Sequence, residues 1–325
     1  MQRTTLGRVN RIASLAVLPV MLLAILAFSR QAQRQSTATP PTEGLLVVAG
    51  LRTDQLTLLD LARQTSASLA LPAAPHELAT IQNRLYVTLT RADLLAEIDP
   101  HAPGLLRLLS LDGRPHGLAA SPSGPVLYIT LGDANALVAL DAASLRELDR
   151  WPTGQTPHAV AIAQGIPHLA AARADRVETV RPTGGTSAPA GRLPETIAAL
   201  PDAVVAASYL DGNLHIYHPV TLQPNATLHL GGGPVRVIPL DHHTVAVALQ
   251  QADRVAIVDL AAAKIVRLLD VPARPDGLCL SPSGAYLAVA SNGDSSVTVF
   301  QTSHWRIAAR LQVPQGPGAC LWLPG

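Results

Sequence analysis

The sequence predicts an all-β fold, a seven-bladed β-propeller with four strands in each blade, from three repeating features. A proline opens a run of small and apolar residues and recurs at steps of 40, 42, 37, 40, 41 and 42 residues. An aspartate holds a fixed place in each period, and four short runs rich in Val, Leu and Ile fit within a period. All-β periods of roughly 40 residues are typical of propeller blades.

The repeating proline marks the expected start of each inner strand, beside the central channel. Proline has no N–H to donate, so it is tolerated on an edge strand. The seven copies are Pro75, Pro115, Pro157, Pro194, Pro234, Pro275 and Pro317.

The repeating aspartate is expected in the turn between the second and third strands. We interpret its carboxylate as a cap for nearby backbone N–H groups. The seven copies are Asp54, Asp93, Asp133, Asp175, Asp211, Asp253 and Asp294.

The period that begins at Pro275 shows the four strands most clearly. We expect them at Gly277–Leu280, Tyr286–Ala290, Ser296–Phe300 and Arg306–Val313, because each run is short, β-branched or apolar, and bounded by turn residues.

The two ends of the chain are expected to complete one blade together. Leu45 begins directly with what is a second strand elsewhere, whereas Pro317 opens an inner strand that no further strand follows. Pairing the last strand with the first would cover the strand edge that an open ring exposes.

The N-terminus has the layout of an export segment. Arginines precede an apolar run over 12–28, and no acidic residue appears before Glu43. We expect residues 1–29 to be an export signal or an N-terminal membrane anchor, 30–43 a polar linker and 44–325 the propeller. The apolar run of 17 residues lies at the lower limit for crossing a bilayer, so cleavage and retention both stay open. Either form predicts an extracytoplasmic protein, which is periplasmic, at the cell surface or secreted.

Composition excludes two classes of protein. Hydrophobic residues make up 48% of the chain and charged residues 14%, which supports a large core and argues against disorder. Because 24 basic residues are balanced by 23 acidic ones, no nucleic-acid partner is expected. The partner is left as an unknown protein or small-molecule ligand, with the membrane added if the N-terminal segment is retained.

The second and third strands carry a motif that identifies a resemblance. The copies are Leu85-Tyr86-Val87-Thr88, Leu127-Tyr128-Ile129-Thr130 and Val297-Thr298-Val299. With the Ser-Pro-Ser-Gly turns and Pro-His-Gly, they resemble the YVTN family of β-propeller repeat proteins over residues 44–325. Leu89 or Leu131 stands where that family has Asn. The resemblance implies the fold and leaves activity open, since relatives of the repeat include surface-layer proteins, periplasmic binding propellers, lactonase-like enzymes and haem d1 domains.

The residues that follow the seven prolines are expected to ring one mouth of the channel. They are His76, His116, His158, Glu195, Val235, Asp276 and Gly318. Imidazoles and carboxylates bind divalent transition metals, so the three histidines are candidate metal ligands, and the cofactor is otherwise unknown. The alternative is that each imidazole only hydrogen-bonds the backbone of a neighbouring blade.

Three arginines sit beside this ring in the sequence. Arg114, Arg236 and Arg274 are candidate ligand-binding residues, because a guanidinium can bind an anion through two parallel hydrogen bonds. The alternative is that they pair with Asp276, Glu195 or the turn aspartates.

Two cysteines fall in adjacent inner strands. Face-packed sheets stand about 10 Å apart, whereas a disulfide needs Cα atoms within about 7 Å, which argues against a bond. Pairing of Cys279 with Cys320 and two buried thiols both stay open.

The sequence favours a binding or scaffolding module with a histidine-lined central face. The alternative is a lactonase-like or metal-dependent hydrolase, with Glu195 or Asp276 as base at the channel mouth. A non-covalent haem d1 carrier is a third interpretation. No Gly-x-Ser-x-Gly occurs, so a serine nucleophile is not supported.

Overall fold

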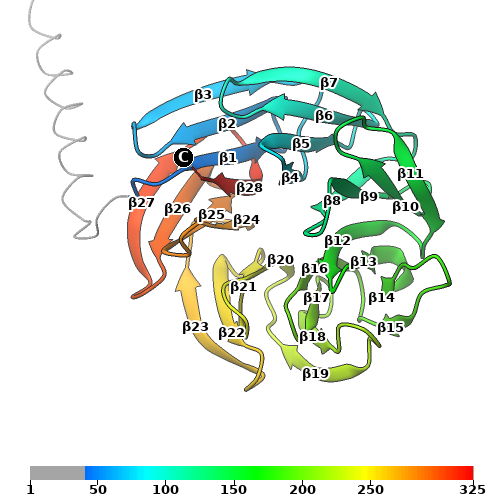
Figure 1. Ribbon diagram of the computed structural model, residues 1–325. Helices are drawn as coiled ribbons and strands as arrows, with labels where there is room; N and C mark the ends of the chain where they lie inside the picture. The colour runs from blue at the N-terminus through cyan, green and yellow to red at the C-terminus, as the bar shows by residue number, and fades with distance from the viewer. Residues whose placement is uncertain (1–40, 325) are drawn as a thin grey trace, which may run out of the picture. The chain divides into compact units, whose positions relative to one another are not determined.

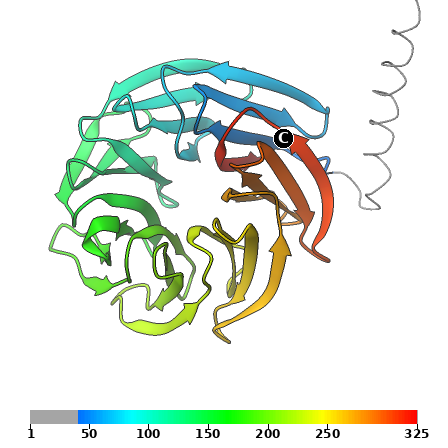
Figure 2. The same ribbon diagram turned by 180° about the vertical axis from the view of Figure 1, so that it is seen from behind.

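The computed structural model describes residues 41–324, which form seven four-stranded antiparallel sheets set as blades around a central channel (Figure 1). The predicted seven-bladed propeller is confirmed, and the view from behind shows the same ring (Figure 2).

Blades 1 to 4 occupy the first half of the described chain and the C-terminal strand. From the channel outward, blade 1 consists of β28 (Pro317–Leu323), β1 (Leu45–Gly50), β2 (Gln55–Asp60) and β3 (Thr65–Ala70), and blade 2 of β4 (Leu78–Ile81), β5 (Arg84–Leu89), β6 (Leu94–Asp99) and β7 (Gly104–Ser110). Blade 3 consists of β8 (Pro115–Ala120), β9 (Val126–Leu131), β10 (Ala136–Asp141) and β11 (Glu147–Pro152), and blade 4 of β12 (Pro157–Ala163), β13 (Ile166–Ala171), β14 (Arg176–Thr179) and β15 (Ser187–Pro189). A single 3₁₀ turn, η1 (Ala172–Ala174), lies in blade 4 and is the one helical element among residues 41–324.

Blades 5 to 7 complete the ring. From the channel outward, blade 5 consists of β16 (Pro194–Ala199), β17 (Val204–Ser208), β18 (Asn213–Tyr217) and β19 (Pro224–His229). Blade 6 consists of β20 (Pro234–Pro239), β21 (Thr244–Leu249), β22 (Arg254–Asp259) and β23 (Lys264–Asp270). Blade 7 consists of β24 (Pro275–Leu280), β25 (Tyr286–Ser291), β26 (Ser296–Gln301) and β27 (Arg306–Gln312). The four strands expected in the last period are all confirmed, with ends that differ by two residues or fewer.

The hydrophobic core lies between blades, because both faces of every middle strand are covered. In β21, Val245 and Val247 pack toward blade 5, while Ala246 and Ala248 pack toward blade 7. In the sequence, such strands are continuous runs of apolar residues, because neither of their faces is exposed to water. The outer strands are different: most residues of β3 are exposed.

The ring closes as predicted. β28 pairs antiparallel with β1, from Leu45 opposite Leu323 to Gly50 opposite Pro317. The C-terminal strand is therefore the inner strand of the first blade.

Four of the seven turn aspartates, Asp93, Asp175, Asp211 and Asp253, accept from a backbone N–H, as expected, and all of these bonds but that of Asp211 reach the segment before the next inner strand. Asp93 Oδ1 accepts from Arg114 N at 2.7 Å, and Asp253 Oδ1 accepts from Arg274 N at 2.8 Å. Both arginines precede a repeat proline and have a φ of 60° and 57°, in the left-handed region. The cap thus stabilises an unfavourable backbone conformation at the entrance of the inner strand.

A β-bulge follows the proline in most inner strands. In β24, Pro275 pairs with Ser291 but Gly277 pairs with Ala290, so Asp276 is left outside the ladder. A bulge changes the direction of a side chain at that point. Blade 2 differs, because β4 begins only at Leu78, after the proline and histidine.

The two cysteines form a disulfide, so the argument from sheet spacing was wrong. Cys279 of β24 and Cys320 of β28 have Cα atoms 5.7 Å apart. Blades converge on the ring axis, so their inner strands approach more closely than stacked sheets do. Glycine permits this approach, since a Cβ on Gly277 would lie 2.0 Å from the carbonyl oxygen of Gly318.

The predicted export or anchor segment, residues 1–29, and the linker up to residue 40 lie outside the described residues. Within residues 41–324, no helix is long and apolar enough to cross a membrane.

We predict that replacing both Cys279 and Cys320 with serine lowers the free energy of unfolding. The disulfide closes a loop of 41 residues, which corresponds to about 4 kcal/mol of lost unfolded-state entropy. Urea unfolding of the variant, and of the wild type under dithiothreitol, measures this value. An unchanged midpoint in both experiments would contradict covalent closure of the ring.

Candidate functional site

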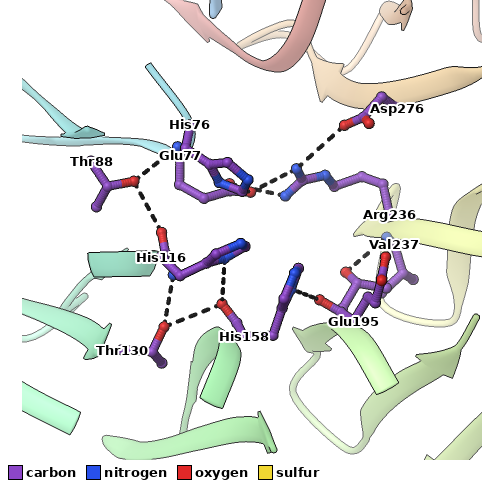
Figure 3. Close-up of polar contacts among 12 residues, drawn as sticks. His76, Glu77, Thr88, His116, Thr130, His158, Glu195, Arg236, Val237 and Asp276 are labelled. Carbon is purple, nitrogen blue, oxygen red and sulfur yellow. Dashed lines mark hydrogen bonds and ion pairs between the residues drawn. The ribbon is translucent and has the colours of Figure 1, made fainter. Parts of the chain in front are cut away.

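The predicted ring of side chains does assemble at the channel. His76, His116, His158, Glu195 and Asp276 come from five different blades and lie around one opening (Figure 3). The bulges after the prolines and the caps before them hold these short segments in place. Val235 and Gly318 occupy the same position in blades 6 and 1 and bring no polar side chain.

The three imidazole rings lie side by side in a row, tilted relative to one another by 58° between His76 and His116 and by 43° between His116 and His158. The ring centroids of His76 and His116 are 3.9 Å apart, and those of His116 and His158 are 3.8 Å apart. His116 Nδ1 lies 3.1 Å from the carbonyl oxygen of His158, and His158 Nδ1 lies 2.7 Å from that of Glu195. Because a carbonyl only accepts, both Nδ1 atoms carry the proton, and in the neutral rings Nε2 is an acceptor.

For two histidines, therefore, the structural interpretation is confirmed: each imidazole binds the backbone of the next blade. His76 differs, since its Nδ1 is buried and has no hydrogen-bond partner among the described residues. The carboxylate oxygen Glu77 Oε1 lies 3.8 Å from this atom, beyond hydrogen-bond distance.

The imidazoles are held neutral. Burial, followed by the mutual influence of the rings, lowers the pKa of His116 well below its ordinary value and that of His158 to about 4. Burial also lowers the pKa of His76 despite the nearby Glu77 carboxylate. A neutral, buried imidazole offers a lone pair without adding positive charge.

Threonines of the strand motif hold the histidine backbone. Thr88 Oγ1 accepts from Glu77 N and donates to the carbonyl of His116, both at 3.0 Å. Thr130 repeats the arrangement one blade on, with Gly117 N at 2.7 Å and the His158 carbonyl at 3.2 Å. The threonine of the Leu-Tyr-Val-Thr motif thus links successive inner strands.

An ion pair spans the channel and joins blades that are not neighbours. Arg236 of β20 donates through Nη1 and Nη2 to the two carboxylate oxygens of Glu77, at 2.9 and 2.7 Å (Figure 3). Burial alone would raise the pKa of Glu77, but the charge and hydrogen bonds of Arg236 hold it below its ordinary value.

Glu77 was missed in the sequence, although a signal for it existed. It is the second residue after its proline, as is Arg236, and these are the two charged residues at that position. The other five blades carry Gly117, Ala159, Thr196, Gly277 and Ala319 there. A single acidic and a single basic residue among small ones predict a pair across the ring.

Two further carboxyl groups flank Arg236. Asp276 Oδ1 lies 3.9 Å from Arg236 Nη2, while its Oδ2 accepts from Gln250 Nε2 at 3.2 Å. The Glu195 side chain makes no hydrogen bond or ion pair with another described residue. Burial raises the pKa of Asp276, and burial together with the Asp276 charge raises that of Glu195 to about 7.

The other two predicted arginines lie at the rim and are engaged elsewhere. Arg114 Nε is 3.1 Å from the turn aspartate Asp133, and both side chains are well exposed. Arg274 Nη2 donates to Gln250 Oε1 at 3.4 Å. The alternative stated for these arginines, pairing with Asp276, Glu195 or a turn aspartate, therefore holds for the side chain of Arg114, whereas that of Arg274 binds an amide oxygen.

The geometry offers no obvious metal centre. Within residues 41–324, no group of three or more His, Cys, Asp or Glu is arranged to hold a metal ion. Metal binding by His76, His116 and His158 therefore stays a prediction.

Comparison with solved structures finds the same fold in proteins of varied function. Hydrazine synthase of Kuenenia stuttgartiensis is 16% identical, with a match that covers 82% of this chain and 94% of that chain and a TM-score of 0.71. A functionally unknown protein from Desulfotomaculum acetoxidans is 13% identical, with coverage of 86% and 99% and a TM-score of 0.74. AztD from Citrobacter koseri is 10% identical, with coverage of 88% and 99% and a TM-score of 0.67.

At such identities the likeness shows the fold alone. No family model matches this chain, and no curated protein matches its sequence. The propeller is thus supported, while membership of the YVTN family is not confirmed.

We predict that Glu195→Gln stabilises the protein at high pH. The folded state holds the Glu195 proton with a pKa of about 7, above the ordinary 4.5, so its ionisation destabilises the fold as pH rises through this range. The melting temperature of the variant should exceed that of the wild type at about pH 8.5 and match it at about pH 4. Glu147→Gln is the control, because Arg150 lowers the pKa of that exposed carboxyl. A constant difference at all pH values would contradict the raised pKa.

We also predict that Arg236→Met destabilises the fold more than the double variant Glu77→Gln/Arg236→Met. Removal of one partner leaves Glu77 and Asp276 uncompensated, at a cost of about 3 kcal/mol, and the second change removes most of that cost. Urea unfolding at neutral pH measures both variants. Arg254→Met, which breaks an exposed pair with Asp270, should cost less than about 1 kcal/mol. Equal losses of unfolding free energy in the single and double variants would contradict a cost of leaving the Glu77 carboxylate without its partner.

Proposed function

We propose that this chain is an extracytoplasmic binding propeller that holds a small ligand at the histidine-lined end of its channel. One observation carries the proposal: five blades bring ionisable side chains to one opening, and some of these side chains have polar atoms without a hydrogen-bond partner among the described residues. No hydrogen bond joins the Glu195 carboxyl to a described side chain, and the buried His76 Nδ1 has no hydrogen-bond partner, with Glu77 Oε1 3.8 Å away. Polar groups in a largely apolar pocket are typical of ligand sites.

The proposed location rests on two features. The N-terminal layout is typical of export, and a disulfide between Cys279 and Cys320 persists in oxidising compartments. Fractionation of cells that express the full-length chain tests the location, with retention in the cytoplasm as the contradicting result.

An enzyme of the hydrolase type is a second candidate, favoured by the pKa of Glu195. A carboxyl with a pKa of about 7 suits a general base. Lactone hydrolysis is the reaction to assay, with Glu195→Gln as the variant that should abolish it.

Ligand binding is tested by thermal shift and calorimetry on the full-length protein, with small polar metabolites and divalent metals as probes. A ligand should bind the wild type and lose at least about tenfold in affinity, close to 1.4 kcal/mol, in His116→Gln. His243→Gln, in the exposed loop between β20 and β21, is the matched control. Elemental analysis of protein purified without chelator tests the metal prediction. Binding that persists unchanged in His116→Gln would place the site elsewhere.

A further inference from the structure

A cavity of about 420 Å³ lies between the outer parts of blades 3 and 4 and is here named the outer pocket. It follows from the short outer strand of blade 4, because β15 has three residues, whereas the outer strands of the other six blades have six or seven. β15 pairs with residues 176–178 of β14, so the segment 180–185 continues without an outer strand, next to Trp151 of β11. A cavity of this size can hold a small organic ligand.

One guanidinium that lines the outer pocket has no acidic partner. The charged lining residues are Arg176, Glu178 and Arg181. Both oxygens of Glu178 are engaged, since Oε1 accepts from Arg176 Nε and Oε2 accepts from Gly154 N at 2.9 Å. Arg181 donates through Nη2 to the carbonyl oxygen of Val220 at 3.1 Å, its buried Nε has no hydrogen-bond partner, and it pairs with no carboxylate among residues 41–324. The pocket therefore contains one positive charge that is not compensated.

Arg181 also reverses the charge of a repeat position. In four other blades the third strand ends in an aspartate that accepts from a backbone N–H of the following turn. These aspartates are Asp60, Asp99, Asp141 and Asp259. Arg181 holds the same place in blade 4, two residues beyond the pairing of Thr179 with His168, as Asp99 is two residues beyond the pairing of Glu97 with Tyr86. A guanidinium cannot accept a hydrogen bond, so the role of these aspartates in the turn does not explain an arginine here.

The rest of the lining includes an apolar wall. Trp151, Pro152, Val180 and Pro182 belong to it, and Trp151 is partly buried against the core cluster that contains Val180. An indole packs well against another aromatic ring. A guanidinium binds a carboxylate through two parallel hydrogen bonds. The outer pocket thus combines a site for an anionic group with a surface for a flat apolar body.

We propose that the outer pocket binds an aromatic carboxylate, with the carboxylate at Arg181 and the ring against Trp151. This inference goes beyond the proposed function, because it concerns a different site from the channel. An ammonium ligand would add positive charge beside the uncompensated guanidinium, and a neutral arene would leave that charge without a partner. A small anion such as acetate would pair with Arg181 but leave the apolar wall uncovered.

Calorimetry on the full-length protein at about pH 7.5 tests the proposal with 2-naphthoate, 2-naphthol, 2-naphthylmethylamine and acetate, since a carboxylate is ionised and a primary amine protonated there. 2-Naphthoate should bind at least about tenfold more tightly than each of the other three, close to 1.4 kcal/mol. Nuclear magnetic resonance of the indole N–H groups gives a second readout. The chain has three tryptophans, and the signal that is missing in Trp151→Phe should shift when 2-naphthoate is added.

Two variants of one residue locate the carboxylate. Arg181→Met should weaken 2-naphthoate about tenfold or more. Arg181→Lys should weaken it less, because an ammonium keeps the charge but not the pair of parallel hydrogen bonds. Arg306→Met, at an exposed position that begins β27, is the matched control and should leave the affinity unchanged. Melting curves establish that the variants are folded, and if Arg181→Met does not fold, Arg181→Lys and the ligand series decide.

The outcomes separate this inference from the proposed function. No binding of 2-naphthoate, equal affinity for 2-naphthol or the amine, or unchanged affinity in both Arg181 variants overturns the inference. If binding is kept in Arg181→Met but lost in His116→Gln, the anion binds in the channel, which supports the proposed function and overturns the inference. If binding is lost in Arg181→Met and kept in His116→Gln, the outer pocket is the site, whether or not a ligand of the channel is found.

Discussion

Pairing of β28 with β1 is the interaction on which the rest of this structure depends. It turns a row of blades into a ring, and a ring makes seven inner strands converge on one axis. Convergence brings β24 and β28 near enough for the Cys279–Cys320 disulfide, which ties the closing strand to the blade beside it. The closure is thus held by backbone hydrogen bonds and by a covalent bond, and glycines permit the close contact.

The same convergence makes a site out of residues far apart in the chain. Arg236 and Glu77 are separated by 159 positions yet form two hydrogen bonds across the channel. Burial then decides the chemistry. It holds three imidazoles neutral and raises the pKa of two carboxyls, whereas Glu77 stays ionised because its guanidinium partner outweighs burial. The acidic groups at the histidine-lined opening, some of them without a hydrogen-bond partner among the described residues, are what the proposed function explains.

The repeat made much of this predictable. Seven prolines and seven aspartates establish the blade count, the strand order and the face on which His76, His116 and His158 lie. Glu77 is not part of the predicted ring, since that ring consists of the first residue after each proline and Glu77 is the second. The disulfide is not predicted, because the spacing of face-packed sheets does not hold for blades that radiate from an axis.

By itself the sequence determined the architecture, because strand periodicity, proline placement and turn aspartates are local signals that act within one period. It also determined that ionisable residues meet at one opening. Only the tertiary structure decided how they interact: which imidazole binds which carbonyl, which carboxylate receives the guanidinium, and which groups remain without a partner. Those outcomes depend on distances across the channel and on burial, and both arise when the ring closes.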